Sequence, residues 1–232
     1  MRERLSPNAD DRPGAAVIDM LVLHYTGMPS AADALDRLCD PTAQVSAHWL
    51  VDEDGTVWRL VPEERRAWHA GASAWAGRSR LNDVSIGIEL VNPGHAWGYR
   101  PFPAAQLASL VTLARGIVRR WRIPPQRVLG HADIAPARKE DPGELFDWRG
   151  LAQAGIGLWP AAHAVPVEAG EAVARALRCV GYDLDQPGVD VACATRAFQR
   201  HWRQERVDGI ADRETRARLA GLLALINRRG RA

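Results

Sequence analysis

Three residues of types that bind metal ions, His24, His131 and Asp141, stand at the ends of apolar runs or in tight loops of this 232-residue sequence. Two imidazoles and a carboxylate would suit a catalytic zinc ion, which takes three protein ligands and keeps a fourth position open for water. His131 and Asp141 lie too far apart to share one helical turn, so the loop between them must fold back. Pro136 and Pro142 suit such a course. The chemistry these residues would support is metal-assisted hydrolysis.

Spacing alone leaves a second interpretation open for each of these three residues. A histidine at the end of a strand is more often a hydrogen-bonded structural residue than a ligand. The Asp-Pro-Gly sequence that starts at Asp141 is more often a plain turn. The pattern is therefore compatible with a metal site, and it is equally compatible with structural roles for these residues.

The elements that must position these residues follow from the hydrophobic pattern. Alternating or continuous apolar runs predict strands over 17–25, 47–51, 56–61 and 84–91. Asp54-Gly55 between the second and third of these runs is a strong hairpin signal. Helical spacing predicts helices over 31–39 and 103–121, the second lying on the sheet. The pattern indicates an α/β fold.

The last third of the chain has a different character. Residues 156–167 are rich in Gly, Ala and Pro and read as a linker between a catalytic domain over 1–155 and a small domain over 168–232. Helical periodicity within that small domain predicts three helices, over 168–180, 189–203 and 212–228. A bundle of this size is marginal for independent folding.

Four blocks in the first part of the chain resemble, in order, the signature of the type 2 N-acetylmuramoyl-L-alanine amidases. They are Leu23-His24-Tyr25-Thr26, Gly87 to Asn92, Gly130 to Pro136, and Arg138-Lys139 with Asp141-Pro142-Gly143. The resemblance extends over roughly residues 15–150 and implies a mixed central β-sheet flanked by helices. One position departs from the family: Ala137 stands where glycine is common, and it would be strained if the backbone there needed a positive φ.

The resemblance implies roles for five residues. His24, His131 and Asp141 match the ligands of one zinc ion per chain, Glu89 matches the general base, and Lys139 matches the cation that stabilises the oxyanion. Zinc lowers the pKa of its bound water towards about 7, and a cation stabilises charge on the attacked carbonyl. The alternatives are an exposed charge for Glu89 and a solvated loop lysine for Lys139.

The implied reaction is hydrolysis of the amide bond between N-acetylmuramoyl, or 1,6-anhydro-N-acetylmuramoyl, groups and the L-alanine of the peptidoglycan stem peptide. His48, His69 and Asn92 match family positions and are predicted to contact substrate, although a core histidine bonded to backbone is an equal alternative for His48. His95 and His201 match no block and are predicted to lie at the surface. The competing functions are a non-catalytic peptidoglycan recognition protein and a different metallohydrolase on the same scaffold.

The region 168–232 resembles a three-helix peptidoglycan-binding domain, through Thr195 to Arg200 and Val207 to Asp212. A wall-binding module would tether the enzyme to a polymer and raise its effective concentration there. The basic residues of such a bundle also suggest DNA binding. A formal net charge of only +2 favours neither nucleic acid nor an anionic membrane as a partner.

Composition sets the remaining expectations. The N-terminal residues lack the apolar core of a signal peptide, which predicts a cytoplasmic protein; export to the cell wall or periplasm by another route is the alternative. No extra apolar helix calls for a partner, so a monomer is expected. The substrate is thus either soluble anhydro-muropeptide or polymeric peptidoglycan. Three cysteines, Cys39, Cys179 and Cys193, lack metal spacing and are predicted to be free thiols, with a Cys179–Cys193 pair as the alternative.

Overall fold

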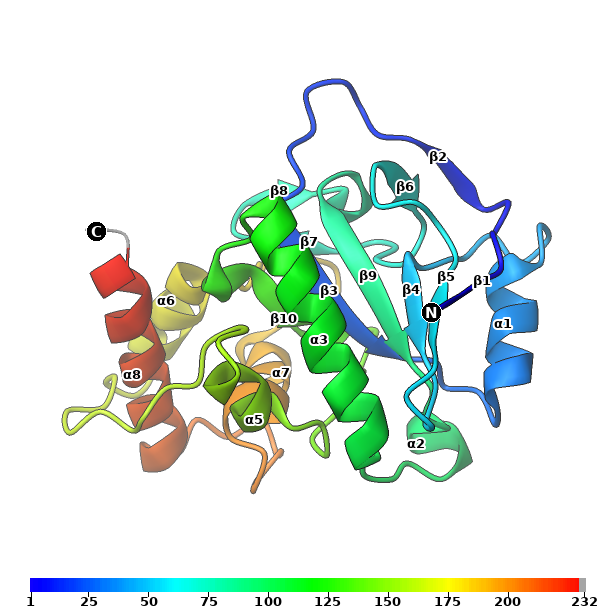
Figure 1. Ribbon diagram of the computed structural model, residues 1–232. Coiled ribbons are helices and arrows are strands. Elements are labelled where there is room, and N and C mark those ends of the chain that lie inside the picture. Colours follow the sequence, from blue (N-terminus) through cyan, green and yellow to red (C-terminus); the bar gives the residue numbers. More distant parts are fainter. Residues whose placement is uncertain (230–232) are drawn as a thin grey trace.

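A mixed six-stranded sheet forms the centre of the protein, in a computed structural model that describes residues 1–229 (Figure 1). The strands lie in the order β1 (Arg2–Glu3), β5 (Val57–Arg59), β4 (Trp49–Val51), β9 (Ser85–Leu90), β3 (Met20–Tyr25) and β10 (Val128–Gly130). Neighbouring strands are parallel except in the β4–β5 hairpin. The predicted mixed sheet and hairpin are confirmed.

Two small antiparallel ribbons and a set of helices surround this sheet. The ribbons pair β2 (Ala9–Asp11) with β6 (Arg65–Ala67) and β7 (Ala74–Trp75) with β8 (Arg78–Ser79). The helices are α1 (Ala31–Cys39), α2 (Gly94–Trp97), α3 (Ala104–Trp121), α4 (His131–Ile134), α5 (Trp148–Gln153), α6 (Glu171–Val180), α7 (Val191–Trp202) and α8 (Arg213–Arg229), with 3-10 turns at Leu81–Asp83 and Pro125–Arg127. Helix α3 runs across one face of the sheet (Figure 1).

Strand alternation decides which side chains face α3 and which face the opposite side. Leu21 and Leu23 of β3 belong to the core beneath α3, together with Ile88 of β9. Because successive strand residues point to opposite faces, His24 and Glu89 point away from α3. The parallel register of β3 and β9 makes these two residues direct neighbours. The sheet alone therefore brings one candidate ligand beside the candidate base.

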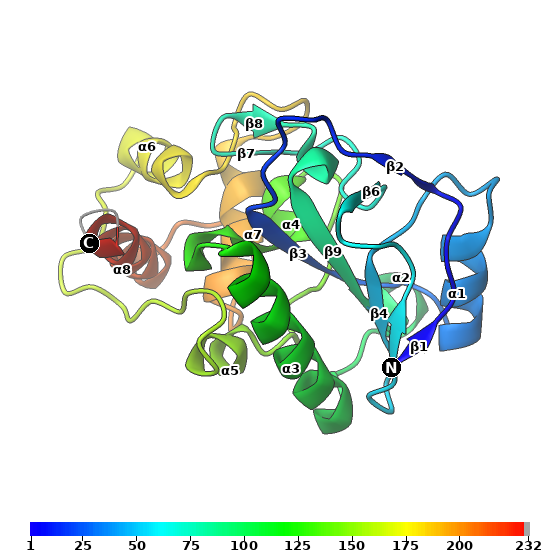
Figure 2. The ribbon, with the colours of Figure 1, turned by 45° about the horizontal axis from the view of Figure 1, so that its top comes forward.

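The three C-terminal helices lie beyond edge strand β10 (Figure 1), and α7 packs against the short helix α4 (Figure 2). Their apolar side chains join a core that also contains sheet residues: Leu177, Phe198 and Trp202 share one cluster with Val22 and Leu129. The helices begin and end within a few residues of the predicted bounds. They pack on the sheet through this continuous core, and their division into a separate domain stays a prediction.

The structure also shows where β3 begins, the state of the cysteines and the backbone conformation at Ala137. Strand β3 starts at Met20 and not at Val17, whose side chain is exposed. The cysteines are free thiols; Cys179 is exposed, and Cys39 and Cys193 are partly exposed. Ala137 is not among the residues with positive φ, so the departure from glycine there causes no strain. Within residues 1–229, no helix combines the length and the apolar character that a bilayer crossing requires.

Candidate metal centre and substrate cleft

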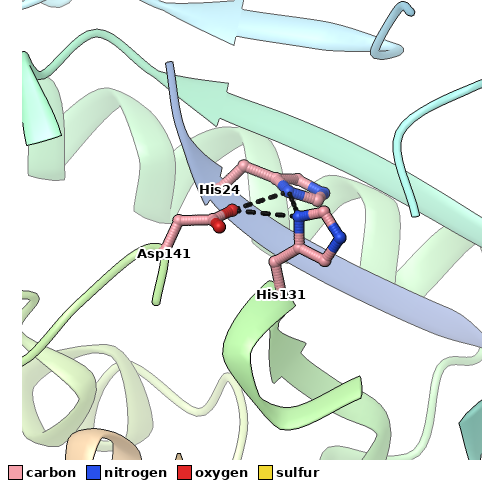
Figure 3. Close-up of side chains that lie close together, drawn as sticks. All are labelled: His24, His131 and Asp141. Carbon is pink, nitrogen blue, oxygen red and sulfur yellow. Dashed lines mark hydrogen bonds and ion pairs between the residues drawn. The ribbon is translucent and has the colours of Figure 1, made fainter. Parts of the chain in front are cut away.

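His24, His131 and Asp141 converge on one point although they come from three different elements (Figure 3). His24 Nδ1 lies 2.9 Å from His131 Nδ1 and 3.0 Å from Asp141 Oδ2. The distance from His131 Nδ1 to the same carboxylate oxygen is 3.2 Å. All three side chains are buried. They form a group that could hold a metal ion.

The loop from His131 to Asp141 folds back, as the sequence requires. The N–H of Ala132 donates to the carbonyl of Asp141 over 2.9 Å, which brings the start of α4 against the end of the loop. Gly130 makes this approach possible, because a Cβ there would lie 2.8 Å from Pro142 Cδ and 3.2 Å from Trp148 Cζ2. The glycine before the histidine thus has a packing reason.

The hydrogen-bond donors behind His24 fix its tautomer. The Ser85 hydroxyl donates to the carbonyl of Leu81 over 2.6 Å, so its oxygen must accept from His69 Nε2, which lies 3.1 Å away. Burial lowers the pKa of His69 well below its ordinary value, so the ring is neutral and its Nδ1 is an acceptor. His24 Nε2–H therefore donates to His69 Nδ1 over 3.1 Å. The lone pair of His24 lies on Nδ1, the atom that faces Asp141.

His131 is fixed in the same way by a backbone carbonyl. Its Nε2 lies 3.1 Å from the carbonyl oxygen of Ala70, and a carbonyl only accepts, so Nε2 carries the proton. The neutral ring then has its lone pair on Nδ1. Asn82 Oδ1 accepts from the N–H groups of His69 and Ala70 over 3.1 Å and 2.8 Å, which secures the segment that orients both ligands.

These donors leave three acceptors facing one another. His24 Nδ1, His131 Nδ1 and a carboxylate oxygen lie within 3.2 Å of one another, yet neither imidazole has a proton to place between them. Burial also lowers the pKa of His24 to about 4, so it does not supply one near neutral pH. A cation would stabilise three buried lone pairs that have no donor between them. The donor set fits a metal ion with nitrogen and oxygen ligands.

Removing the Ser85 hydroxyl should weaken metal binding without touching a ligand. In Ser85→Ala, His69 Nε2–H loses its acceptor and the ring no longer has one enforced tautomer, so His24 is held less firmly. Loss of such an outer hydrogen bond typically lowers metal affinity about 10–100-fold. Competition with a chromophoric chelator measures this. Ser109→Ala is the matched control. Ser109 lies on α3, and its hydroxyl also donates to a backbone carbonyl, that of Gly55. Equal affinities for Ser85→Ala and the unmodified protein would contradict the tautomer assignment.

A cleft of about 440 Å³ opens over the ligand group. Its walls include His24, His69, Glu89, His131, Lys139 and Asp141. Glu89 Oε2 is buried and has no hydrogen-bond partner among residues 1–229. Burial and the nearby Asp141 carboxylate raise the pKa of Glu89 well above its ordinary value, and Lys139 opposes that shift. An unpartnered acceptor beside the ligands is suited to receive a proton from a water molecule.

Two of the predicted substrate contacts, those of His48 and Asn92, stay predictions, and the structure places both side chains in the interior of the fold. His48 is completely buried and lies outside the walls of the cleft; its Nδ1 accepts from the N–H of Gly87 over 2.9 Å, and its Nε2 lies 3.1 Å from the carbonyl of Arg65. Asn92 is also completely buried, and its amide donates to the carbonyl of Arg100 over 2.7 Å. Both residues support the fold. His69 does line the cleft, and its contact with substrate stays a prediction.

The surface position predicted for His201 is wrong. Its side chain is buried between the rings of Trp148 and Trp202, with centroid distances of 3.6 Å and 3.7 Å. Its Nδ1 lies 2.7 Å from Asp133 Oδ2. Sequence reasoning missed Asp133, Ser85 and the carbonyl of Ala70. Ala70 contributes only backbone, and a serine in a strand or an aspartate in a one-turn helix gives no signal of its own.

Known amidases resemble this chain in sequence. The family model described as N-acetylmuramoyl-L-alanine amidase matches residues 13–144. The N-acetylmuramoyl-L-alanine amidase AmiD of Escherichia coli is 42% identical, over 89% of this chain and 82% of its own length. The 1,6-anhydro-N-acetylmuramyl-L-alanine amidase AmpD of Haemophilus influenzae is 37% identical, over 63% of this chain and 88% of its own length.

Solved structures show the same likeness. The complex of E. coli AmiD with the substrate anhydro-N-acetylmuramic acid-L-Ala-D-γ-Glu-L-Lys has a TM-score of 0.78 at 41% identity, and covers 92% of both chains. AmpDh3 from Pseudomonas aeruginosa, in complex with anhydromuramic pentapeptide, has a TM-score of 0.82 at 34% identity over 96% of this chain and 98% of its own. Such coverage extends well into the C-terminal helices.

Proposed function

The chain belongs to the N-acetylmuramoyl-L-alanine amidase family, and we propose that it uses one zinc ion to hydrolyse the bond between muramoyl or 1,6-anhydromuramoyl groups and L-alanine. The observation that carries this proposal is the meeting of three buried acceptors, His24 Nδ1, His131 Nδ1 and Asp141 Oδ2, with no proton between them. Glu89, whose Oε2 has no hydrogen-bond partner among residues 1–229, lies in the same cleft. A non-catalytic recognition protein would need neither the full ligand set nor this carboxylate.

We assign the proton transfer to Glu89, and the stabilisation of the negative charge that develops in the reaction to Lys139. Zinc, when bound, polarises the amide carbonyl and activates a water molecule. Glu89 Oε2 accepts the proton of that water and then donates it to the alanine nitrogen, which leaves as an amine. Lys139 lines the same cleft, and its ammonium group stabilises the negative charge that develops on the carbonyl oxygen.

The substrate proposal draws on the relatives and on the C-terminal helices. The AmiD and AmpDh3 structures named above hold anhydromuramyl peptides, so we assign soluble anhydro-muropeptides to this cleft as substrates. The helices α6, α7 and α8 are proposed to bind polymeric peptidoglycan and to present it to the cleft. The protein is proposed to act as a monomer, with no nucleic acid or membrane partner.

Removing zinc should abolish cleavage of both substrates, and adding it back should restore cleavage. Without a cation, the buried Asp141 carboxylate and the two imidazole lone pairs face one another with no proton between them. We expect about one zinc ion per chain, the number that a catalytic site takes. Elemental analysis gives the stoichiometry. Release of L-alanine-terminated peptides from intact sacculi and from soluble anhydro-muropeptides gives the activity before chelation, after it and after zinc addition. A protein that holds no metal and gains no activity from zinc would contradict the proposal.

A further inference from the structure

The C-terminal helices reach the segment that carries His131. Asp133 stands two residues after that ligand, in the one-turn helix α4. Its carboxylate accepts from the Tyr182 hydroxyl over 2.7 Å and lies 2.7 Å from His201 Nδ1. Its third partner is the N–H of Gly130, at 2.8 Å. Two of the three groups that bind Asp133 therefore come from the C-terminal part of the chain.

Burial makes these contacts decisive for the position of α4. The Asp133 side chain is 1% exposed, and a carboxylate so removed from water is stable only where its oxygens are hydrogen-bonded. Tyr182 is itself held edge-on against Trp75 at a centroid distance of 4.9 Å. His201 is held between two tryptophans. Packing against aromatic rings therefore holds both side chains in place independently of their contact with the carboxylate.

A second set of contacts reaches the segment that carries Asp141. Arg200 of α7 forms an ion pair with Glu140, the residue before this ligand, and its Nε lies 3.7 Å from Glu144 Oε2. Gln204, just after α7, donates to the carbonyls of Glu144 and Phe146, over 2.7 Å each. The end of α7 therefore holds the loop on both sides of Asp141.

We propose that the segment from Tyr182 to Gln204 is a positioning element of the metal centre, which holds His131 through Asp133 and Asp141 through its neighbouring loop. The inference rests on the proposed function, because it assigns a metal to the ligand group. This role differs from that of a tether. Loss of a tether would slow only the hydrolysis of polymer, whereas loss of a positioning element would also lower metal affinity and the turnover of small soluble substrates.

Tyr182→Phe tests the contact with Asp133, because it removes one hydroxyl and keeps the ring that packs on Trp75. We expect zinc affinity to fall about 10-fold, the lower end of the range for contacts that orient metal ligands without binding the metal. At saturating zinc, kcat on a soluble anhydromuramyl tripeptide should fall several-fold while KM and binding to sacculi stay unchanged. The Co²⁺-substituted protein should show an altered visible absorption spectrum, which reports ligand geometry directly.

Arg200→Gln tests the contact with the Asp141 loop independently and should also weaken zinc binding. Thr215→Val is the matched control: its hydroxyl accepts from Gln199 and Arg203 inside the C-terminal helices and does not contact either ligand segment. It should lower the melting temperature and leave zinc affinity and the Co²⁺ spectrum unchanged.

The outcomes separate this inference from the proposed function. Unchanged zinc affinity, kcat and Co²⁺ spectrum in both Tyr182→Phe and Arg200→Gln would overturn the positioning role while zinc-dependent activity of the unmodified protein still stood. An equal loss of affinity in Thr215→Val would also overturn it, because the effect would then follow stability. A protein with no zinc-dependent activity would overturn the proposed function itself.

Discussion

Asp141→Asn should lose zinc and lose more than about 10³-fold in amidase activity, because the variant lacks the one anionic ligand and with it the activated water. The same substitution should leave the zinc-free protein at least as stable as before. In the unmodified protein, Asp141 Oδ2 faces two imidazole lone pairs at 3.0 Å and 3.2 Å. An asparagine amide placed there can donate to either nitrogen, which relieves that repulsion.

Thermal unfolding with and without zinc measures zinc binding and the stability of the zinc-free protein, and cleavage of a soluble anhydro-muropeptide measures the activity. Zinc at a hundredfold excess over its Kd stabilises a folded protein by about 2.7 kcal/mol, so the unmodified protein should gain in melting temperature and Asp141→Asn should not. Asp147→Asn is the control, because Asp147 lies in the same part of the chain but caps α5 through the N–H of Gly150. Full zinc stabilisation of Asp141→Asn would contradict the ligand assignment.

Glu89→Gln should lower kcat about 10²–10⁴-fold while zinc content stays at that of the unmodified protein. Glutamine fills the same space, but it neither accepts the proton of water nor returns it to the leaving amine. Glu89 Oε2 has no hydrogen-bond partner among the described residues, so the substitution breaks no contact of that atom in the fold. The stability of the protein should therefore change little.

Steady-state kinetics on a soluble anhydro-muropeptide, with zinc content determined on the same sample, measures this effect. Glu63→Gln offers a buried carboxylate outside the cleft for comparison: Glu63 accepts from Trp49 and Trp121 and pairs with Arg120. That control should lose stability and keep its kcat per folded molecule. A Glu89→Gln enzyme with normal kcat would remove Glu89 from the proton transfer.

Much of the fold could be predicted because its signals are local. The apolar runs of β3 and β9, the Asp54-Gly55 turn and the periodicity of α3 each lie within one segment. Strands such as β1 and β2 were not predicted, since two or three residues carry no periodicity. Their places depend on pairing with β5 and β6, which no local pattern records.

The three candidate ligands could be picked out from the sequence, whereas the residues that support them could not. His24, His131 and Asp141 are marked by residue type and by resemblance. The resemblance also marked His48 and Asn92, but it does not distinguish a residue that holds the fold from one that meets substrate. Both side chains are completely buried, which is the environment of a residue that holds the fold.

The support for the ligands comes from pairs that are distant in sequence. His69 meets His24 across 45 positions, and His201 meets Asp133 across 68. A histidine that matches no motif is expected at the surface unless the packing of its helix is known. Because α7 packs against α4, His201 is buried and contacts Asp133, in the segment that also carries His131.

The most direct test of the proposed function is the position of the bond that the zinc-loaded protein cuts. Purified 1,6-anhydro-N-acetylmuramoyl-tripeptide is incubated in H₂¹⁸O, and the products are separated and weighed by mass spectrometry. The prediction is free 1,6-anhydro-N-acetylmuramic acid with one ¹⁸O in its lactyl carboxylate, and a tripeptide with an unlabelled free L-alanine amine. Intact substrate, or cleavage between amino acids with the muramoyl–alanine bond preserved, would contradict it.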